Sequence, residues 1–309
     1  MSWTLYEFSL PCYPPFETRK GMILKIKHPD GTTGWGEISP LPERNKETLS
    51  QAKQQVLEAL EGRKNILYPS VALGLEMAHQ SISPINKTLP LCALLTGDPK
   101  QILKKAESVY AQGYRTVKLK VSHLSFSDAR AVLSLLSPQF QVRVDVNRAW
   151  SFDQACAFFS QFDPNAFEFI EEPTYELDKL SKFTHPFALD ESLISLSSSD
   201  LTTFPMLQAL IVKPTLIGNQ QECAYYHTLA QKLKLSCVLS SAFESGLGIL
   251  QICKLSQALG MEHVPLGLDT YRFLKEDLLT TALDFSKPYL KVDEPIALNP
   301  THLKQIAHG

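Results

Sequence analysis

The chain has 309 residues, of which 44% are hydrophobic and 20% charged, and its formal net charge is −2. This balance is typical of a soluble globular protein with one large domain or two ordinary ones. The sequence has no long basic run and no uninterrupted apolar stretch of about 18 residues, which argues against a nucleic-acid partner and against a membrane span. The first residues lack the pattern of a secretory signal, so we expect a cytoplasmic protein.

The six cysteines are spread along the chain and form no CxxC pair. This spacing predicts buried free thiols in a reducing compartment and argues against a structural zinc site. The cysteines are Cys12, Cys92, Cys156, Cys223, Cys237 and Cys253.

Residues 1–90 are expected to form an α+β unit. Alternating apolar and polar residues predict three strands, with a hairpin turn at 28–31. Two segments with helical periodicity follow, the first closed by Gly62 and the second preceded by Pro69. The predicted strands are 3–10, 21–28 and 32–39, and the predicted helices are 46–62 and 70–82.

Residues 91–284 follow a different pattern, in which short apolar runs alternate with helical segments. Strands that alternate with helices pair in parallel, and eight such runs predict closure into a barrel. About 190 residues are available, fewer than the roughly 250 of a typical barrel, so we expect a barrel without a final helix. The tail, about 285–309, is expected to complete the N-terminal unit. The predicted strands are 91–97, 116–121, 141–146, 167–172, 186–191, 207–213, 235–241 and 264–269, and predicted helices include 100–113, 151–162, 219–233 and 247–260.

Three consecutive predicted strands of this barrel end in a carboxylate. The residues are Asp145, Glu171 and Asp190, which lie 26 and 19 residues apart, about one strand–helix unit each. Because the strands of such a barrel end on one face, the three carboxylates are expected on the same rim. Carboxylates at close range require a cation, and oxygen ligands without His or Cys favour Mg²⁺.

Each carboxylate also has an ordinary structural explanation. Asp145 would serve equally well as the cap of a helix that begins near Ser151. Glu171 would suit a turn before Pro173, and Asp190 a solvated loop. Three such coincidences at the ends of three successive strands are less expected than one shared site.

Three lysines follow the same logic. Lys118 and Lys120 are two positions apart in a predicted strand, so both side chains face the same way. Lys213 ends the predicted strand 207–213 and is expected across the barrel from Lys120. A metal cation and a second ammonium would lower the pKa of Lys120 and Lys213, and a lysine so shifted acts as a base near neutral pH. The alternative is that a lysine side chain extends into solvent. This alternative is favoured for Lys118 considered by itself, but not for Lys120 and Lys213 together.

These parts predict a reaction at the carbon next to a carboxylate. A metal on the substrate carboxylate stabilises the enediolate that forms when one lysine removes the α-proton. A lysine base combined with Mg²⁺ is known from the enolase superfamily.

The sequence resembles that superfamily over most of its length, and within it the o-succinylbenzoate synthases, the dehydratases of menaquinone biosynthesis. The motifs are long and occur in the family's order. The resemblance implies a modified (β/α)₇β TIM-type barrel with a capping domain formed by both chain ends. The motifs are GWGEISPLP at 34–42, PSVALG at 69–74, KLK at 118–120, VDVNRAW at 144–150, FIEEP at 169–173, LDES at 189–192, IVKPTLIG at 211–218, LSSAFESGLGI at 239–249 and GLDT at 267–270.

The resemblance also implies roles for the candidate residues. Asp145, Glu171 and Asp190 would bind Mg²⁺, with Mn²⁺ as a substitute. Lys120 would remove the proton next to the carboxylate of 2-succinyl-6-hydroxy-2,4-cyclohexadiene-1-carboxylate and then protonate the departing hydroxyl, a syn elimination that gives o-succinylbenzoate. Lys213 would lie across the substrate.

Further residues are expected around this centre. Lys118 would lie beside the substrate carboxylate, and the loop after the seventh strand would hold the succinyl end, although Ala242 interrupts its serines. Arg143 either tunes Lys120 or forms a structural ion pair. The expected substrate-binding residues are Lys118, Ser240, Ser241, Thr18 and Arg19, and the supporting residues are Asn147, Arg143, Glu191 and Glu244.

Other functions remain open at this stage. An N-acylamino acid racemase, a dipeptide epimerase or a muconate cycloisomerase would use the same lysines and metal. Asp269 is the only aspartate where dipeptide epimerases usually carry two, which counts against that activity. No histidine occupies the position of Lys213, as a mandelate-type racemase would require. A non-catalytic binding barrel is a rival of another class, and it would be expected to lose a ligand or a lysine. The expected partner is a small-molecule carboxylate, and the oligomeric state is not predicted.

Overall fold

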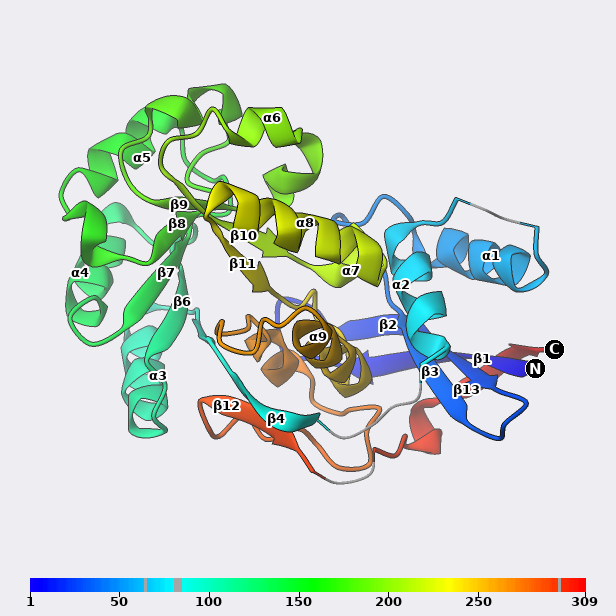
Figure 1. Cartoon of the computed structure of the whole chain (residues 1–309). Helices are drawn as coiled ribbons and strands as arrows, with labels where there is room; N and C mark the ends of the chain where they lie inside the picture. Colours follow the sequence, from blue (N-terminus) through cyan, green and yellow to red (C-terminus); the bar gives the residue numbers. More distant parts are fainter. Residues whose placement is uncertain (64–65, 81–84, 294–295) are drawn as a thin grey trace.

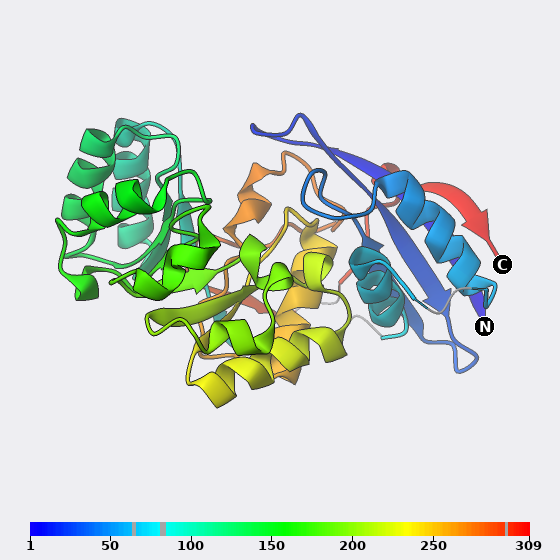
Figure 2. The same cartoon turned by 90° about the horizontal axis from the view of Figure 1, so that it is seen from above.

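The computed structural model describes residues 1–63, 66–80, 85–293 and 296–309 (Figure 1). These residues form an antiparallel sheet with two helices at one side of a curled parallel sheet (Figures 1 and 2). No helix in the described ranges is long and apolar enough to cross a membrane. All six cysteines are free thiols, and all but the half-buried Cys156 are buried, which confirms the predicted free thiols.

The antiparallel sheet combines both ends of the chain. Its strand order is β13–β1–β2–β3, and the backbone of Trp3 near the N-terminus exchanges hydrogen bonds with that of Gly309. Figure 1 shows the two termini side by side at this sheet. The three predicted N-terminal strands are therefore confirmed, and the tail adds a fourth. The strands are β1 Ser2–Pro11, β2 Thr18–Lys27, β3 Thr33–Ile38 and β13 Lys304–His308.

Two helices, α1 Leu49–Leu60 and α2 Pro69–Ala78, cover this sheet. The Thr48 side chain caps α1 by accepting a hydrogen bond from the backbone N–H of Gln51, and Gly62 beyond its end has a φ of +74°. Both predicted helices are confirmed. The last predicted residues of the second helix, 81–82, lie outside the described residues.

The parallel sheet contains seven strands in sequential order from β5 to β11. The eighth predicted strand closes the barrel only through isolated bridges, Leu91 to Leu266 and Ser240 to Gly267. Pro265, within this run, has no N–H to donate, which limits the pairing there. The strands are β5 Ala93–Leu95, β6 Thr116–Lys120, β7 Gln141–Asp145, β8 Phe169–Glu171, β9 Phe187–Leu189, β10 Leu207–Val212 and β11 Ser236–Leu239.

Helices connect most of these strands, and 3₁₀ helices η2 Leu177–Lys182 and η3 Glu191–Ser195 follow β8 and β9. In the described part of the chain, the closing run is followed by the 3₁₀ helix η4 Asp269–Phe273 instead of a full helix, as the barrel's short length predicted. A separate pair, β4 Ile85–Pro90 and β12 Tyr289–Val292, lies beside the barrel. The helices are α3 Pro99–Ala111, α4 Phe126–Leu136, α5 Phe152–Phe159, α6 Ser198–Leu201, α7 Pro214–Ile217, α8 Gln220–Leu233 and α9 Gly246–Ala258.

The barrel interior separates an apolar floor from a polar rim. A buried cluster that includes Phe169, Ala188 and Ile211 fills the floor. Because side chains alternate between the two faces of a strand, the residues two positions further along point the same way. Those residues are Glu171, Asp190 and Lys213. The strand period therefore directs charged groups to the ends of β8, β9 and β10.

Candidate active site

Strand register brings the candidate residues to one level of the rim. Lys120 on β6 pairs with Asp145 on β7, and Asp145 pairs with Glu171 on β8. Asp190 follows β9 directly, two residues beyond Ala188, the partner of Glu171. The carboxylates are 0%, 1% and 6% exposed, in chain order. Three buried acidic groups thus share one end of the barrel.

The ammonium group of Lys118 lies between two of these carboxylates. Its Nζ is 2.8 Å from Oδ2 of Asp145 and 2.6 Å from Oε1 of Glu171. Burial alone would lower the pKa of Lys118, but the charges of Asp145 and Glu171 outweigh it and hold that pKa well above its usual value. Burial raises the pKa of Glu171 to about 8, against the attraction of Lys118 and with the repulsion of Asp145 and Asp190.

Lys213 forms a second ion pair, with Asp190. Burial would lower the pKa of Lys213, but the charges of Asp190, Glu171 and Glu191 together outweigh it and raise that pKa above its usual value. The pKa of Asp190 is lowered, because Lys213 and Lys118 together outweigh its burial. The lowered pKa expected for Lys213 presupposes a cation beside it and stays a prediction, and here the ammonium group is paired with Asp190.

Lys120 differs from the other two lysines. It forms no ion pair or hydrogen bond with any residue in the described part of the structure. Its pKa is lowered, chiefly by burial and further by the positive charges of Lys118 and Lys213, against the opposing attraction of Asp145. A lysine with an unpaired amine and a lowered pKa is suited to accept a proton.

The chemistry of the donor set fits a hard divalent cation. Oδ2 of Asp145 is buried and, although close to Lys118, has no hydrogen bond of acceptable geometry with the described residues. The other ligand candidates, Glu171 and Asp190, also offer carboxylate oxygens. Nevertheless, within the described ranges, no three Asp, Glu, His or Cys side chains are arranged as a ready ligand set. Lys118 and Lys213 hold oxygens of all three carboxylates, so a bound cation would displace at least part of these contacts.

A cavity of about 90 Å³ opens onto these groups and is called the inner cavity. Ser240 and Ser241 line it, but both hydroxyls donate to the carbonyl oxygen of Gly267, at 3.0 and 3.1 Å. Gly267 approaches closely enough that a Cβ there would lie 2.6 Å from the Ser240 hydroxyl. The two serines therefore lie at the predicted place. Their hydroxyls also link the end of β11 to the closing run 264–269 through Gly267. The lining also includes Arg44, Lys118, Lys120, Asp145, Asn147, Glu191, Lys213, Leu216, Asp269 and Thr270.

Two supporting residues flank the carboxylates. The Asn147 backbone, with a φ of +50°, donates to Oδ1 of Asp145 at 3.0 Å. Glu191 forms an ion pair with Arg44, which lies between β3 and α1. Asp145 does not cap the following helix, because Ser151 does so, which removes the structural alternative considered for Asp145.

Arg19 is not placed to contact a substrate in this structure. Its side chain is 2% exposed and donates to the carbonyl oxygens of Phe243, Pro40, Ser39 and Lys20. The guanidinium therefore fastens the N-terminal sheet to the loop after β11. A buried arginine in a strand looks like any other polar strand residue in sequence, so its acceptors were not predictable.

Three further predicted residues also lie away from the inner cavity. Thr18 is exposed at the start of β2 and pairs with Pro11. Glu244 is buried and accepts hydrogen bonds from Thr215 and from the Ala242 backbone, so it shapes the loop after β11. Arg143 forms a buried ion pair with Glu168 at 2.7 Å, which favours the structural explanation for this arginine.

Glu172 was not among the predicted residues. It accepts hydrogen bonds from the backbone of Asp190 and from the backbone and hydroxyl of Ser192, at 2.6 to 2.9 Å. Burial raises its pKa to about 7 against these hydrogen bonds. Glu172 thus fixes the segment that carries Asp190. The sequence signal for Glu172 was the second glutamate of the FIEEP motif. Consecutive side chains of a strand point to opposite faces, so Glu172 cannot share the position of Glu171 and needs a role of its own.

Together, a parallel barrel, a capping sheet and a rim of three carboxylates and three lysines define an enolase-like barrel enzyme. Residues 101–296 match the family model described as enolase C-terminal domain-like, and residues 2–82 match the MenC N-terminal domain. A relative from Yersinia enterocolitica, an o-succinylbenzoate synthase, is 31% identical over 94% of this chain and 97% of its own length. The chain belongs to the o-succinylbenzoate synthase family of the enolase superfamily.

Solved structures agree with this assignment. The o-succinylbenzoate synthase of Thermosynechococcus elongatus, which holds magnesium in its active site, is 25% identical, with a TM-score of 0.70 over 90% of this chain and 95% of that one. The L-Ala-D/L-Glu epimerase of Bacillus subtilis has a TM-score of 0.79 over 99% of this chain and 98% of that one. It is 18% identical, so this second likeness concerns the fold alone.

Proposed function

We propose that this protein dehydrates 2-succinyl-6-hydroxy-2,4-cyclohexadiene-1-carboxylate to o-succinylbenzoate, a step of menaquinone biosynthesis. The observation that carries the proposal is the register of Lys120, Asp145 and Glu171 on three adjacent strands. This register sets an unpaired amine beside a cluster of hard oxygen ligands. Family membership supports the choice of substrate.

The cofactor of this proposal is a divalent cation, Mg²⁺, with Mn²⁺ as a substitute. Asp145, Glu171 and Asp190 would hold it through carboxylate oxygens. When bound, the cation supplies a Lewis acid that stabilises the charge developing on the substrate carboxylate. Oδ2 of Asp145 supports this assignment, because it is buried and is balanced by the Lys118 ammonium without a hydrogen bond of normal geometry.

Lys120 carries both proton transfers. Its neutral amine takes the proton from the carbon next to the carboxylate, and the resulting ammonium gives a proton to the hydroxyl that leaves as water. One group performs both steps on one face of the ring, which is a syn elimination. The lowered pKa of Lys120 makes the neutral amine more available than in an ordinary lysine.

Lys213 and Lys118 would stabilise charge. Lys213, which is paired with Asp190, would face the substrate from the β10 side, and Lys118 lies beside the carboxylates deeper in the barrel. Both carry raised pKa values, so both remain ammonium groups at neutral pH. Their positive charge favours binding of an anionic substrate and of the anion formed on proton removal.

The site argues against a dipeptide epimerase. Asp269, which would have to meet a substrate ammonium group, is 3% exposed and accepts a hydrogen bond from the Leu94 backbone at 2.8 Å. It also forms ion pairs with Lys105 and Arg272. Its charge is therefore already neutralised within the protein.

The direct test mixes purified protein, Mg²⁺ and the cyclohexadiene substrate, and follows the aromatic absorbance of the product. We expect turnover in the range of ordinary enzymes, about 1 to 10³ per second. A parallel sample contains N-succinyl amino acids in D₂O, with α-deuteration measured by NMR. Deuteration without any dehydration would overturn the proposal in favour of an N-acylamino acid racemase.

We also propose that the enzyme works in the cytoplasm on a small-molecule carboxylate, without a nucleic-acid or membrane partner. The free thiols suit a reducing compartment. Fractionation of cells followed by detection of the protein tests this placement.

A further inference from the structure

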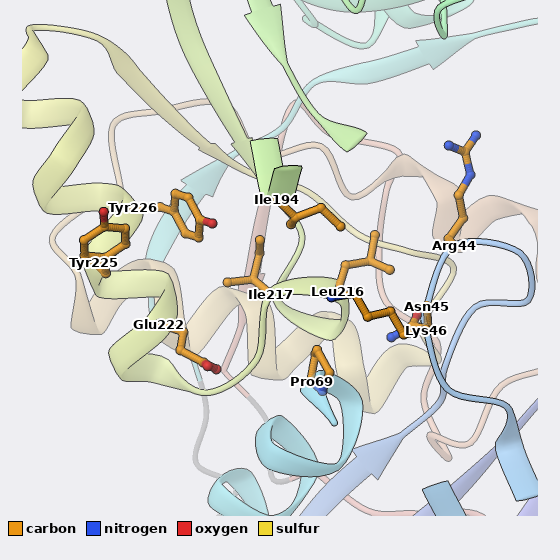
Figure 3. Close-up of a pocket in the computed structure, with 10 residues that line it drawn as sticks. All are labelled: Arg44, Asn45, Lys46, Pro69, Ile194, Leu216, Ile217, Glu222, Tyr225 and Tyr226. Atoms are coloured by element: carbon orange, nitrogen blue, oxygen red, sulfur yellow. The ribbon is translucent and has the colours of Figure 1, made fainter. Parts of the chain in front are cut away.

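Three adjoining cavities lie between the loop that carries Arg44 and the barrel rim. The inner cavity contains Lys120 and Lys213. A middle cavity of about 160 Å³ shares Lys213 with it and adds Ile211. An outer cavity of about 300 Å³ shares Ile194 and Ile217 with the middle one and is lined by ten residues (Figure 3). Arg44 and Leu216 line all three, so the cavities adjoin one another.

The outer cavity has one apolar and aromatic side. Tyr226 on α8 faces Ile194 and Ile217, and Tyr225 lies beside Tyr226 with their ring centroids 5.3 Å apart (Figure 3). Tyr225 is 54% exposed, so a large part of an aromatic ring is open to a ligand. Aromatic and aliphatic side chains of this kind favour contact with another ring. The outer cavity is also larger than the inner one and has room for a six-membered ring with its substituents.

The opposite side of the outer cavity carries positive charge. Arg44, Asn45 and Lys46 come from the loop between β3 and α1 (Figure 3). Lys46 is exposed and has no ion pair with any residue that the structure describes. The one acidic residue of the lining, Glu222, accepts a hydrogen bond from the backbone of Asn219 at 2.9 Å. An available ammonium group therefore faces the apolar side.

We propose that the outer cavity is a second binding site, which holds cyclic carboxylic acids on their way to or from the catalytic centre. The ring packs between the tyrosine pair and Ile194, and a carboxylate binds Lys46. The ligand class rests on the proposed function, since both substrate and product of that reaction are ring-bearing dicarboxylates. Passage inward leads along Leu216 and past the Arg44–Glu191 ion pair. Arg44 is 41% exposed and Glu191 10% exposed in this pair, so passage requires Arg44 to swing outward and to leave a largely buried carboxylate behind.

The experiment measures binding without turnover. Isoleucine-methyl-labelled protein in EDTA is titrated with o-succinylbenzoate, and separately with benzoate, while methyl NMR signals are recorded. EDTA removes the metal that binding at the catalytic centre would require. We expect the signals of Ile194 and Ile217 to shift saturably, and those of Ile211 in the middle cavity to move less. Isoleucine-to-valine variants assign the three signals.

Substitutions locate the ligand. Lys46→Ala and Tyr225→Ala are expected to weaken the apparent affinity about three- to fivefold, the effect of losing one exposed contact. Lys232→Ala is the matched control, because Lys232 is exposed on the last turn of α8 and lines none of the three cavities. This control variant should bind like the unchanged protein.

Two results would overturn the second site. One is the absence of saturable shifts at Ile194 and Ile217, and the other is binding that Lys46→Ala and Tyr225→Ala both leave unchanged. Failure of the dehydration assay with intact methyl shifts would instead reject the proposed reaction and leave the site in place. The two proposals can therefore fail separately.

Discussion

Lys120 and Asp145 lie opposite each other on the parallel strands β6 and β7, while Lys118, two residues earlier, reaches Asp145 and Glu171 with its ammonium group. The two lysines of the KLK motif thus divide their roles. Lys118 neutralises the buried carboxylates, and Lys120 keeps an unpaired amine with a lowered pKa. The two lysines are two residues apart on one face of β6, so they lie at different depths in the barrel and meet different partners.

This division predicts that Lys118 and a divalent cation compete for the same oxygens. In Lys118→Met, Mg²⁺ should bind about tenfold more tightly, because a positive charge next to the cation is removed. Calorimetric titration of Mg²⁺ measures the change, with Lys100→Met on the exposed start of α3 as control. Weaker binding of Mg²⁺ would show that Lys118 supports the metal site instead.

The same variant should be less stable without metal. Loss of the ammonium leaves Asp145 and Glu171 buried without their partner, which is expected to lower the free energy of unfolding by about 3 kcal/mol or more. Denaturant unfolding in EDTA tests this, and added Mg²⁺ should restore most of the loss. Equal stability of the two proteins in EDTA would contradict the role of Lys118 as a counter-ion.

Metal binding should also raise thermal stability. At 100 times its dissociation constant, Mg²⁺ is expected to add about 2.7 kcal/mol to the free energy of unfolding, because it binds the folded chain alone. Differential scanning calorimetry with and without Mg²⁺ measures the rise in Tm. Asp145→Asn should abolish most of the rise, whereas Asp153→Asn, on the first turn of α5, should keep it. A full rise in Asp145→Asn would place the metal elsewhere.

Much of this architecture follows from local sequence patterns. Strands such as 116–121 and 141–146 were predictable because apolar runs ended at charged residues in a regular order. Asp145, Glu171 and Asp190 were predictable as a group for the same reason: the ends of parallel strands meet on one rim. The closing run at 264–269 was identified, but its reduction to isolated bridges depends on neighbours distant in sequence.

The peripheral residues were harder to predict. Arg19 was expected at the substrate, yet its acceptors Ser39, Pro40 and Phe243 come from loops far along the chain. The Arg44–Glu191 pair joins the two units across 147 positions, and no periodic pattern predicts such a contact. Long-range hydrogen bonds of loops depend on how the two units pack against each other, and patterns within a short stretch of sequence do not predict that packing.

Arg19 should therefore act on structure more than on binding. Arg19→Met is expected to lower the free energy of unfolding by about 3 kcal/mol, since it leaves buried carbonyl oxygens without a donor. It should also lower kcat, because the loop after β11 loses its anchor. Arg130→Met, at an exposed site on α4, serves as control in denaturant unfolding. Unchanged stability with a raised KM would instead assign Arg19 to substrate binding.

The most direct test of the catalytic centre is Lys120→Ala, assayed for dehydration in Mg²⁺ beside the unchanged protein. Because Lys120 has no ion pair with the described residues, the variant should keep its Tm and its affinity for Mg²⁺. Turnover should fall by about 10³-fold or more, as expected for loss of a general base that is also the general acid. Retention of near-normal turnover in a folded, metal-binding Lys120→Ala protein would contradict the account.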